Sequence, residues 1–391
     1  MDSGILQNIR VLDLTRYVSG PYCGVLLADM GAEVIKVEKQ DTGEVSRTVA
    51  PYFGGVSLFF PPYNRSKKSV TANLRTPEGI ALVKALVSKC DVILDNFRAG
   101  TMEKMGLGYE TLRAINPGII AVSITGFGQR GPMRDRLAFD GIISAQSGVT
   151  RVEQGHVERS KGPIHDYMAA VYAAFGTVLA LYEKQKTGLG QYIDVSMLAC
   201  SAMIRTTSIA DAALNGEEAA QSGDDSAPFG YLKAADGWIN YHAGTNRFYN
   251  NLLTILDDPF LHQERFIGNI RCRIEHAQEL MDHIQAWAAD KTCDQLDAIF
   301  TAAGIPAGIV ATPTRLRNHP QLLANGFLLE QQVDGIEGPV PYMAFPFHMS
   351  NHPQLSYRPA PKVGEHTEEI LGGLLGLSRE DLADLRKSGV I

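Results

Sequence analysis

Short apolar runs and helical segments alternate along the first third of the chain. Residues 9–14 and 33–38 have the apolar, β-branched character of strands, and residues 22–30 between them are typical of a helix that ends at Gly31. Such an arrangement forms a βαβ unit, in which the two strands are parallel. Further strand-like runs follow at 70–74, 91–95 and 119–124. The pattern predicts an α/β protein with a parallel sheet and helices on its faces.

A second, smaller set of elements follows a polar segment. Residues 215–226 are polar and acidic, which predicts a linker. Beyond it we expect a hairpin that turns at Asp236-Gly237, two helices and a closing strand, at 231–241, 248–256, 276–289 and 303–310. These elements predict a smaller α/β domain at 227–315.

One carboxylate stands at the start of a long uncharged stretch. Asp166 precedes sixteen uncharged residues, 167–182, which predict a buried helix. Asp is a preferred N-cap residue, and the helix dipole would keep it ionised. From this pattern alone, Asp166 is either a cap or a reactive carboxylate.

Composition narrows the classes of partner. The 391 residues carry a formal net charge of -7, which argues against nucleic acid as a main partner. The five cysteines are widely spread and none lies in a Cys-x-x-Cys pair, so we expect reduced thiols, a cytoplasmic protein and no metal site. The N-terminus lacks the features of a signal peptide, and the stretch 167–182 is too short for a membrane span, so we expect no membrane contact.

The glycine pattern does not favour a dinucleotide. Glu38 after the second strand suits a ribose, but the first turn lacks Gly-x-Gly-x-x-Gly. The motif occurs once, from Gly126 to Gly131, and the polar residues after it predict a loop. An NAD-dependent dehydrogenase is therefore disfavoured.

Basic side chains follow several of the expected strands. Ligands of open parallel sheets bind at the carboxyl ends of the strands, so these side chains are candidates to surround a phosphate-bearing ligand. The alternative is a solvated charged surface. The residues are Arg16, Lys39, Lys67, Lys68, Arg98 and Lys104.

Taken together, several short motifs resemble the family III CoA-transferases, the CaiB/BaiF group. They occur in the family's order and span the chain nearly end to end. They are Val11-Leu-Asp-Leu-Thr with Gly20-Pro21, the segments 27–38 and 64–69, Asn96-Phe-Arg-Ala-Gly, Gly126-Phe-Gly-Gln-Arg-Gly-Pro, Thr187-Gly-Leu-Gly-Gln, Gly304-Ile-Pro-Ala-Gly and Pro361-Lys-Val-Gly-Glu-His-Thr.

The resemblance implies a doubly wound, Rossmann-like large domain made from both chain ends, with a small α/β domain inserted. Its N-terminal part would be 1–214, followed by the linker 215–226, the small domain 227–315, and a return linker and C-terminal part at 316–391. It also implies a homodimer of interlocked subunits.

The resemblance further implies CoA transfer from an acyl-CoA thioester to a small carboxylic acid, with Asp166 as the catalytic residue. CoA and acyl-CoA would be substrates, and no tightly bound cofactor is implied. An ionised Asp needs no general base to attack a thioester. The family's CoA contacts carry over onto Arg16, Tyr17, Val18, Ser19, Lys39, Asn96, Phe97, Lys104 and Met105.

Other functions stay open. The related 2-methylacyl-CoA racemases have a His-Asp pair where this chain has Phe139-Asp140, and phenylalanine cannot accept a proton. We therefore expect Asp140 to be a cap or hydrogen-bond acceptor. A non-catalytic acyl-CoA binding protein is the other alternative. His165 either orients Asp166 or faces solvent or packing. For the acyl group, nearby aromatic residues favour an apolar acid, whereas Arg247 favours a second carboxylate.

Overall fold

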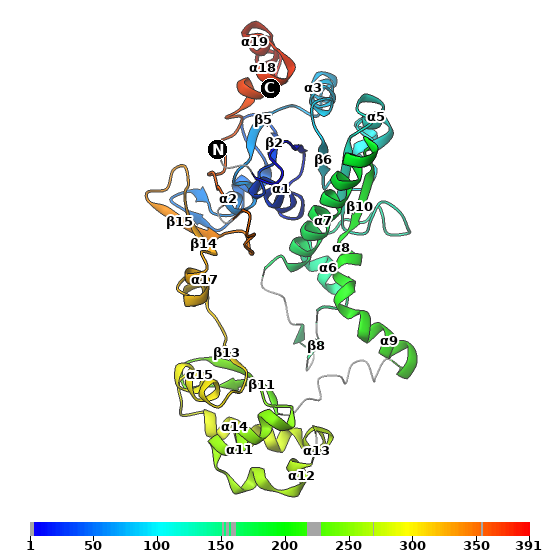
Figure 1. Cartoon of the computed structure of the whole chain (residues 1–391). Helices are drawn as coiled ribbons and strands as arrows, with labels where there is room; N and C mark the ends of the chain where they lie inside the picture. The colour runs from blue at the N-terminus through cyan, green and yellow to red at the C-terminus, as the bar shows by residue number, and fades with distance from the viewer. Residues whose placement is uncertain are drawn as a thin grey trace. The chain divides into compact units, whose positions relative to one another are not determined.

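The computed structural model describes residues 4–150, 152–153, 156–157, 162–216, 228–268, 270–352 and 355–391. The chain divides into two compact units (Figure 1). Unit 1 comprises residues 1–205 and 323–391, and unit 2 comprises 206–322. The small domain expected at 227–315 lies within unit 2, whereas most of the expected linker, 215–226, falls outside the described residues.

Unit 1 contains a six-stranded, entirely parallel sheet. The order along the sheet is β10-β7-β6-β1-β2-β5. From β1, the chain first adds β2 and β5 on one side, and then crosses back to add β6, β7 and β10 on the other side. This is the doubly wound arrangement, with its topological switch between β1 and β6. The strands are β1 Arg10–Asp13, β2 Glu33–Glu38, β5 Lys68–Thr71, β6 Val92–Asp95, β7 Ile120–Thr125 and β10 Tyr192–Ser196.

Helices cover both faces of this sheet with separate apolar clusters. One cluster joins α3, α5, α18 and α19 to one face, and the other joins α1, α7 and α8 to the opposite face. Buried aliphatic side chains on both faces are what a central parallel sheet requires. The helices of unit 1 are α1 Ser19–Asp29, α2 Phe60–Asn64, α3 Pro77–Val87, α4 Thr101–Lys104, α5 Tyr109–Ile115, α6 Asp140–Gln146, α7 Ile164–Thr187, α8 Met197–Ala202, α18 Thr367–Leu375 and α19 Arg379–Lys387, with the 3-10 turns η1 Val45–Thr48 and η2 Met203–Arg205.

The C-terminal segment of unit 1 packs against β5 and the residues after it, in the N-terminal segment. The backbone N–H of His366 donates to the Ser69 carbonyl at 2.9 Å, and that of Asn73 donates to the Val390 carbonyl at 2.8 Å. Figure 1 shows α18 and α19 beside α3 near this edge. Three hairpins complete unit 1: β3 Tyr52–Phe53 with β4 Val56–Ser57, β8 Val152–Glu153 with β9 His156–Val157, and β14 Leu328–Gln332 with β15 Pro339–Met343.

Helix α7 departs from the sequence prediction in two ways. It begins at Ile164, so Asp166 occupies the third helical position and is not the N-cap. The expected burial of the whole uncharged stretch is also wrong. Its alanines face α1 and the sheet, but large apolar side chains lie exposed on the other side, at Val171, Tyr172, Phe175, Val178, Leu179 and Tyr182. Within the described residues, α7 is also the single helix with the length and hydropathy of a membrane span.

Unit 2 has a three-stranded antiparallel sheet packed against helices around its own apolar core. The expected hairpin is confirmed, because β11 Phe229–Lys233 pairs with β12 Trp238–His242. The expected strand at 303–310 is shorter and forms β13 Ala307–Ile309. The helices are α9 Thr206–Asn215, α11 Asn246–Leu256, α12 Glu264–Ile267, α13 Ile270–Glu275, α14 Ala277–Ala288, α15 Cys293–Ala302 and α16 Pro313–Arg317, with η3 Pro259–His262; α17 Pro320–Ala324 spans the boundary with unit 1.

Candidate active site

The switch point between β1 and β6 brings together two segments that lie 80 residues apart. The Asn96 side chain accepts from the Arg16 N–H at 2.8 Å and donates to the Arg16 carbonyl at 2.7 Å. The Arg16 guanidinium lies 5.0 Å from the centre of the Phe97 ring. These residues follow the carboxyl ends of adjacent strands, which is where a doubly wound sheet binds its ligand.

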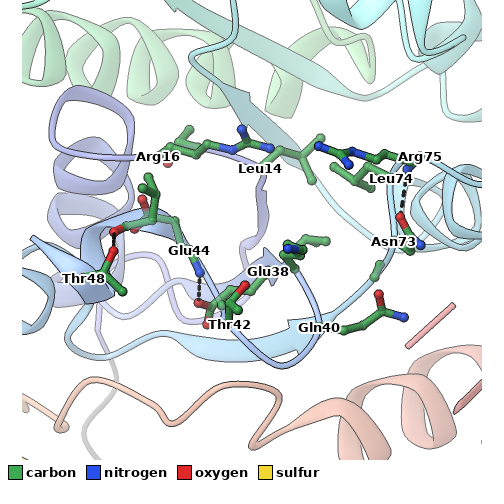
Figure 2. A pocket seen from close by; sticks show the side chains of 16 residues that line it. Leu14, Arg16, Glu38, Gln40, Thr42, Glu44, Thr48, Asn73, Leu74 and Arg75 are labelled. Carbon is green, nitrogen blue, oxygen red and sulfur yellow. Dashed lines mark hydrogen bonds between the residues drawn. The ribbon is translucent and has the colours of Figure 1, made fainter. Parts of the chain in front are cut away.

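A cavity of about 540 Å³ opens beside this point, at the ends of β1, β2 and β5 (Figure 2). Arg16 and Lys39 line it, as does Arg75, and Figure 2 shows Arg16 and Arg75 along one edge. The cavity therefore carries three exposed cations on loops after three neighbouring strands. Such a set suits phosphate groups.

Glu38 lines the same cavity, but its carboxylate is already engaged. Arg47 donates to both carboxylate oxygens at 2.7 and 2.8 Å, and the Ser69 hydroxyl donates to one of them at 2.6 Å. Together with the hydrogen bond from the Glu44 N–H, these contacts leave Glu38 poorly available for a ribose. The structure thus adds a reason to disfavour a dinucleotide.

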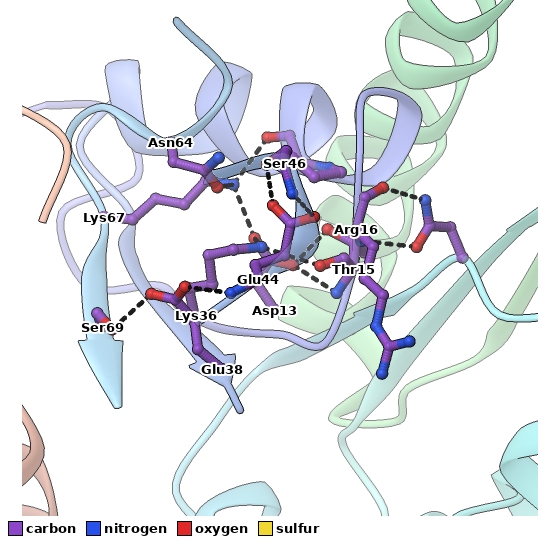
Figure 3. Close-up of polar contacts among 12 residues, drawn as sticks. Asp13, Thr15, Arg16, Lys36, Glu38, Glu44, Ser46, Asn64, Lys67 and Ser69 are labelled. Carbon is purple, nitrogen blue, oxygen red and sulfur yellow. Dashed lines mark hydrogen bonds and ion pairs between the residues drawn. The ribbon is translucent and has the colours of Figure 1, made fainter. Parts of the chain in front are cut away.

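A buried ionic network packs against the loop that follows β1 and carries Thr15 and Arg16 (Figure 3). Lys67 donates to Asp13 at 2.7 Å, and its side chain is fully buried, as is that of Asp13. Lys36 donates to the Thr15 carbonyl at 2.9 Å. Burial alone would raise the pKa of Asp13, but the charges of the two lysines hold it below its usual value. Lys67 is consequently a structural residue, which corrects its assignment to a phosphate site.

Lys68 is also engaged, since it bonds Glu33 and Glu369, both at 2.7 Å. The first turn itself is strained at Tyr17, whose φ of 64° places a bulky residue in the left-handed region. The Tyr17 N–H donates to Glu44 at 3.0 Å, and its ring meets Phe139 edge-on at 5.8 Å. Backbone strain of this kind persists where the surrounding structure fixes it, often at functional sites.

Asp166 is held by residues from two other helices. Asp140, the first residue of α6, accepts from the backbone N–H groups of His165 and Asp166 at 2.8 and 3.1 Å. It thereby performs the capping role for α7 that Pro163 cannot. The expectation that Asp140 is a cap and acceptor is confirmed, and this use makes it a poor candidate for a racemase base.

Burial and neighbouring groups raise the pKa of the Asp166 carboxyl. Burial raises its pKa, the neighbouring charge of Asp140 raises it further, and hydrogen bonds from the side chain and backbone of Ser19 oppose both, so the pKa is about 6. Asp166 is therefore mostly ionised at pH 7. Ser19 begins α1, only three residues after Arg16, so the first turn links the cavity to the carboxylate.

His165 is fully buried, which excludes the solvent-facing alternative and agrees with the expected packing role. The Ser201 hydroxyl donates to the Met197 carbonyl at 2.7 Å, and it lies 2.8 Å from His165 Nδ1. A hydroxyl has one proton, so Ser201 accepts from Nδ1–H. The ring ties α7 to α8, and its Nε2 is buried without a hydrogen-bond partner among the described residues.

Three further residues were expected to contact CoA: Val18, Lys104 and Met105. Val18 is buried against the start of α1 and presents no side chain to solvent. Lys104 is exposed at the end of α4 and Met105 packs on the core. Within the described part of the chain, no hydrogen bond or ring contact joins either of them to Arg16.

Sequence reasoning missed Arg75 and the three tyrosines Tyr22, Tyr63 and Tyr167. Arg75 lies just beyond the carboxyl end of β5, so the rule that singled out Lys39 could have found it. The tyrosines come from three separate helices, and no spacing in the sequence joins them.

Within the described residues, no group of three or more His, Cys, Asp or Glu side chains is placed to hold a metal ion. A doubly wound sheet with a cationic cavity beside its switch point is typical of α/β proteins that bind phosphate-bearing ligands. The chain belongs to CoA-transferase family III, whose model matches residues 6–367.

The chain is similar to named CoA-transferases over almost its whole length. It is 37% identical to the succinyl-CoA–D-citramalate CoA-transferase of Chloroflexus aurantiacus, over 99% of this chain and 98% of that protein. It is 33% identical to the human succinyl-CoA:glutarate CoA-transferase, over 99% and 90%. A CaiB/BaiF family protein from Brucella suis has the same fold, with a TM-score of 0.83 at 29% identity over 95% of this chain and 100% of that one. The protein is accordingly a CoA-transferase, which uses CoA thioesters as substrates, and the predicted α/β fold is confirmed.

Proposed function

We propose that this enzyme transfers CoA through covalent intermediates on Asp166. The observation that carries the proposal is the position of the Asp166 carboxylate beside Ser19. Ser19 begins α1 three residues after Arg16, which lines the cationic cavity. A CoA molecule with its phosphates beside Arg16, Lys39 and Arg75 would extend its thioester along this segment toward Asp166.

The reaction consists of four successive nucleophilic displacements at carbonyl carbons. An Asp166 oxygen attacks the thioester carbonyl, the C–S bond breaks, and CoA thiolate leaves a mixed anhydride. The thiolate then attacks the aspartyl carbonyl and releases the donor acid, which forms an aspartyl-CoA thioester. The acceptor carboxylate displaces the thiolate to give a second anhydride. Attack of the thiolate on the acceptor's carbonyl releases the new acyl-CoA and restores Asp166.

The surroundings of Asp166 suit these steps. A pKa of about 6 leaves the carboxylate ionised at neutral pH while keeping it a better nucleophile than an ordinary, more acidic Asp. The Ser19 N–H and hydroxyl are donors at the start of α1, where an oxyanion is stabilised by fixed dipoles. The expected CoA contacts form three groups. Lys39 lines the cavity, and Lys104 and Met105 lie at the end of α4. The others lie at the switch point: Arg16, Tyr17, Val18, Ser19, Asn96 and Phe97.

The relatives suggest the class of acid. Those compared above are named for succinyl-CoA with D-citramalate and with glutarate. We therefore infer a succinyl-CoA donor and a small dicarboxylic acid as acceptor.

The intermediate can be trapped directly. The enzyme would be incubated with succinyl-CoA and hydroxylamine, or with borohydride, and the peptide containing residue 166 analysed by mass spectrometry. A hydroxamate or a reduced side chain at position 166, absent from Asp166→Asn, is expected. An unmodified residue 166 while CoA exchange proceeds normally would rule out the covalent mechanism, and CoA binding without any transfer would favour a binding protein.

We also infer a homodimer, because the exposed apolar side of α7 needs a cover that the described residues of unit 1 do not provide. Six large apolar side chains lie there at helical spacing. Sedimentation would show the mass of two chains, whereas a monomer at micromolar concentration would contradict this inference.

A further inference from the structure

Three tyrosines from separate helices pack together beside Asp166, and we call them the tyrosine cluster. The Tyr22 and Tyr167 ring centres lie 4.3 Å apart, and Tyr63 lies 6.1 Å from Tyr167 and 6.4 Å from Tyr22. Tyr167 directly follows Asp166 on α7, and Tyr63 is buried at the end of α2. The cluster therefore adjoins the reactive carboxylate.

The cluster presents a pair of hydroxyl groups. Tyr167 donates to the Tyr63 hydroxyl at 3.4 Å, well beyond the 2.7 to 2.8 Å usual for O–H···O bonds. Each hydroxyl has one proton, and no acceptor takes the Tyr63 proton within the described part of the chain. The Tyr63 hydroxyl is therefore a free donor. The Tyr167 hydroxyl makes a weak hydrogen bond, from which a stronger acceptor could take its proton.

The Tyr63 hydroxyl stays protonated, so it can only act as a donor toward an anion. Burial raises the pKa of Tyr63 far above its usual value, and the nearby charges of Tyr167 and Asp166 add to the effect.

An apolar cavity adjoins the pair. Its volume is about 500 Å³, and its walls come from Gly162, Pro163 and the first turns of α7. Two of the wall residues, Val171 and Tyr172, belong to the exposed apolar side of α7 that we assign to the dimer, so in the dimer the partner subunit would close this cavity from outside. Carbon atoms dominate these walls, which suits methylene groups, and Tyr167 belongs both to the cavity wall and to the tyrosine cluster. A ligand with a short aliphatic chain and a polar end matches this combination.

We infer that the Tyr63–Tyr167 hydroxyl pair binds the second carboxylate of a dicarboxylic acyl group and so selects dicarboxylates over monocarboxylic acids. The inference rests on the function proposed above. Bound there, the carboxylate accepts one hydrogen bond from each hydroxyl, the Tyr167 proton turning from Tyr63 to the ligand. The donors are needed because the substrate's free carboxylate and Asp166 are both anionic, and two like charges in one partly buried site repel.

The test compares two donors that differ only in that second carboxylate, succinyl-CoA and butyryl-CoA. Transfer from succinyl-CoA and inhibition by butyryl-CoA would be measured for the wild type, Tyr63→Phe and Tyr167→Phe, with Tyr22→Phe as the matched control for packing in the cluster. Loss of a hydrogen bond to a charged group lowers affinity about 10-fold to 100-fold. We expect kcat/KM for succinyl-CoA to fall by that factor in the first two variants, mainly through KM.

The inhibition constant of butyryl-CoA and the behaviour of Tyr22→Phe should stay within about twofold of the wild type, because neither involves the hydroxyl pair. The inference is overturned if both variants keep full succinyl-CoA activity. It is also overturned if butyryl-CoA binding weakens by the same factor, or if Arg247→Ala alone removes the preference. Failure of the wild type to transfer CoA between any acids would instead reject the proposed function.

Discussion

The Asp140 carboxylate has two opposed effects on Asp166: it hydrogen-bonds the Asp166 backbone and its charge repels the Asp166 carboxylate. The Asp140 carboxylate accepts from the Asp166 backbone N–H at 3.1 Å and caps α7, while its negative charge helps to raise the pKa of the Asp166 carboxyl to about 6. One side chain therefore fixes the position of the proposed nucleophile and adjusts its basicity.

Replacing Asp140 by Asn should separate these two effects. An amide oxygen still accepts from both N–H groups, but the charge is gone, so the pKa of Asp166 should fall. The acid limb of the kcat/KM profile is expected to move to lower pH, by a few tenths of a unit to about one unit. Asp140→Ala, which also removes the cap, should lose about 1 kcal/mol of stability in addition. An unchanged acid limb in Asp140→Asn would show that this charge does not tune the nucleophile.

Asp166→Asn should abolish transfer and yet stabilise the fold at pH 7. The folded-state pKa is raised from 3.8 to about 6, so the protonated form is favoured by folding, and stability is lost as pH rises through this range. An ionised Asp166 then costs on the order of 1 to 2 kcal/mol after allowance for its partial exposure. Thermal unfolding at pH 7 and pH 4 should show the gain of the Asn variant at pH 7 and its disappearance near pH 4. A variant that is less stable at pH 7 would contradict this expectation.

The neighbours Lys67 and Lys68 should differ sharply in their contribution to stability. Lys67→Met leaves the buried carboxylate of Asp13 without its closest partner, at an expected cost of about 3 to 5 kcal/mol. Lys68→Met removes two partly exposed ion pairs and should cost about 1 kcal/mol or less. Denaturant unfolding of the two variants measures the difference. Equal effects would mean that the Asp13 network is not the main support of the first turn.

CoA affinity should depend on the cavity arginines and on salt. Arg16→Ala and Arg75→Ala are each expected to raise the Kd for CoA about tenfold at low salt, and less at higher ionic strength, because screening weakens contacts with phosphate. Arg113→Ala is the matched control, since Arg113 is exposed on α5 and faces Glu110. Calorimetric titration with CoA gives the Kd values. Losses that are equal in all three variants would indicate a general effect of net charge.

Much of the fold follows from local patterns in the chain. The apolar runs of β1, β2, β6 and β7 and the turn at Asp236-Gly237 depend on nearest neighbours, and the sequence predicts them closely. The loop from Gly126 to Gly131 likewise forms no helix, as its polar sequence indicates. Asp166 stands out because it is the one charge before a long uncharged stretch.

The roles of individual polar residues were decided by tertiary contacts. The sequence presents Lys67 and Lys68 as equivalent, but folding buries the first against Asp13 and leaves the second at the surface. It leaves Asp166 as either a cap or a reactive carboxylate, but the cap comes from Asp140, 26 positions earlier, and the raised pKa of Asp166 comes mainly from burial. Local propensity acts over a few residues, whereas burial and charge pairing depend on which distant segments the sheet brings together, so only the folded chain could assign these roles.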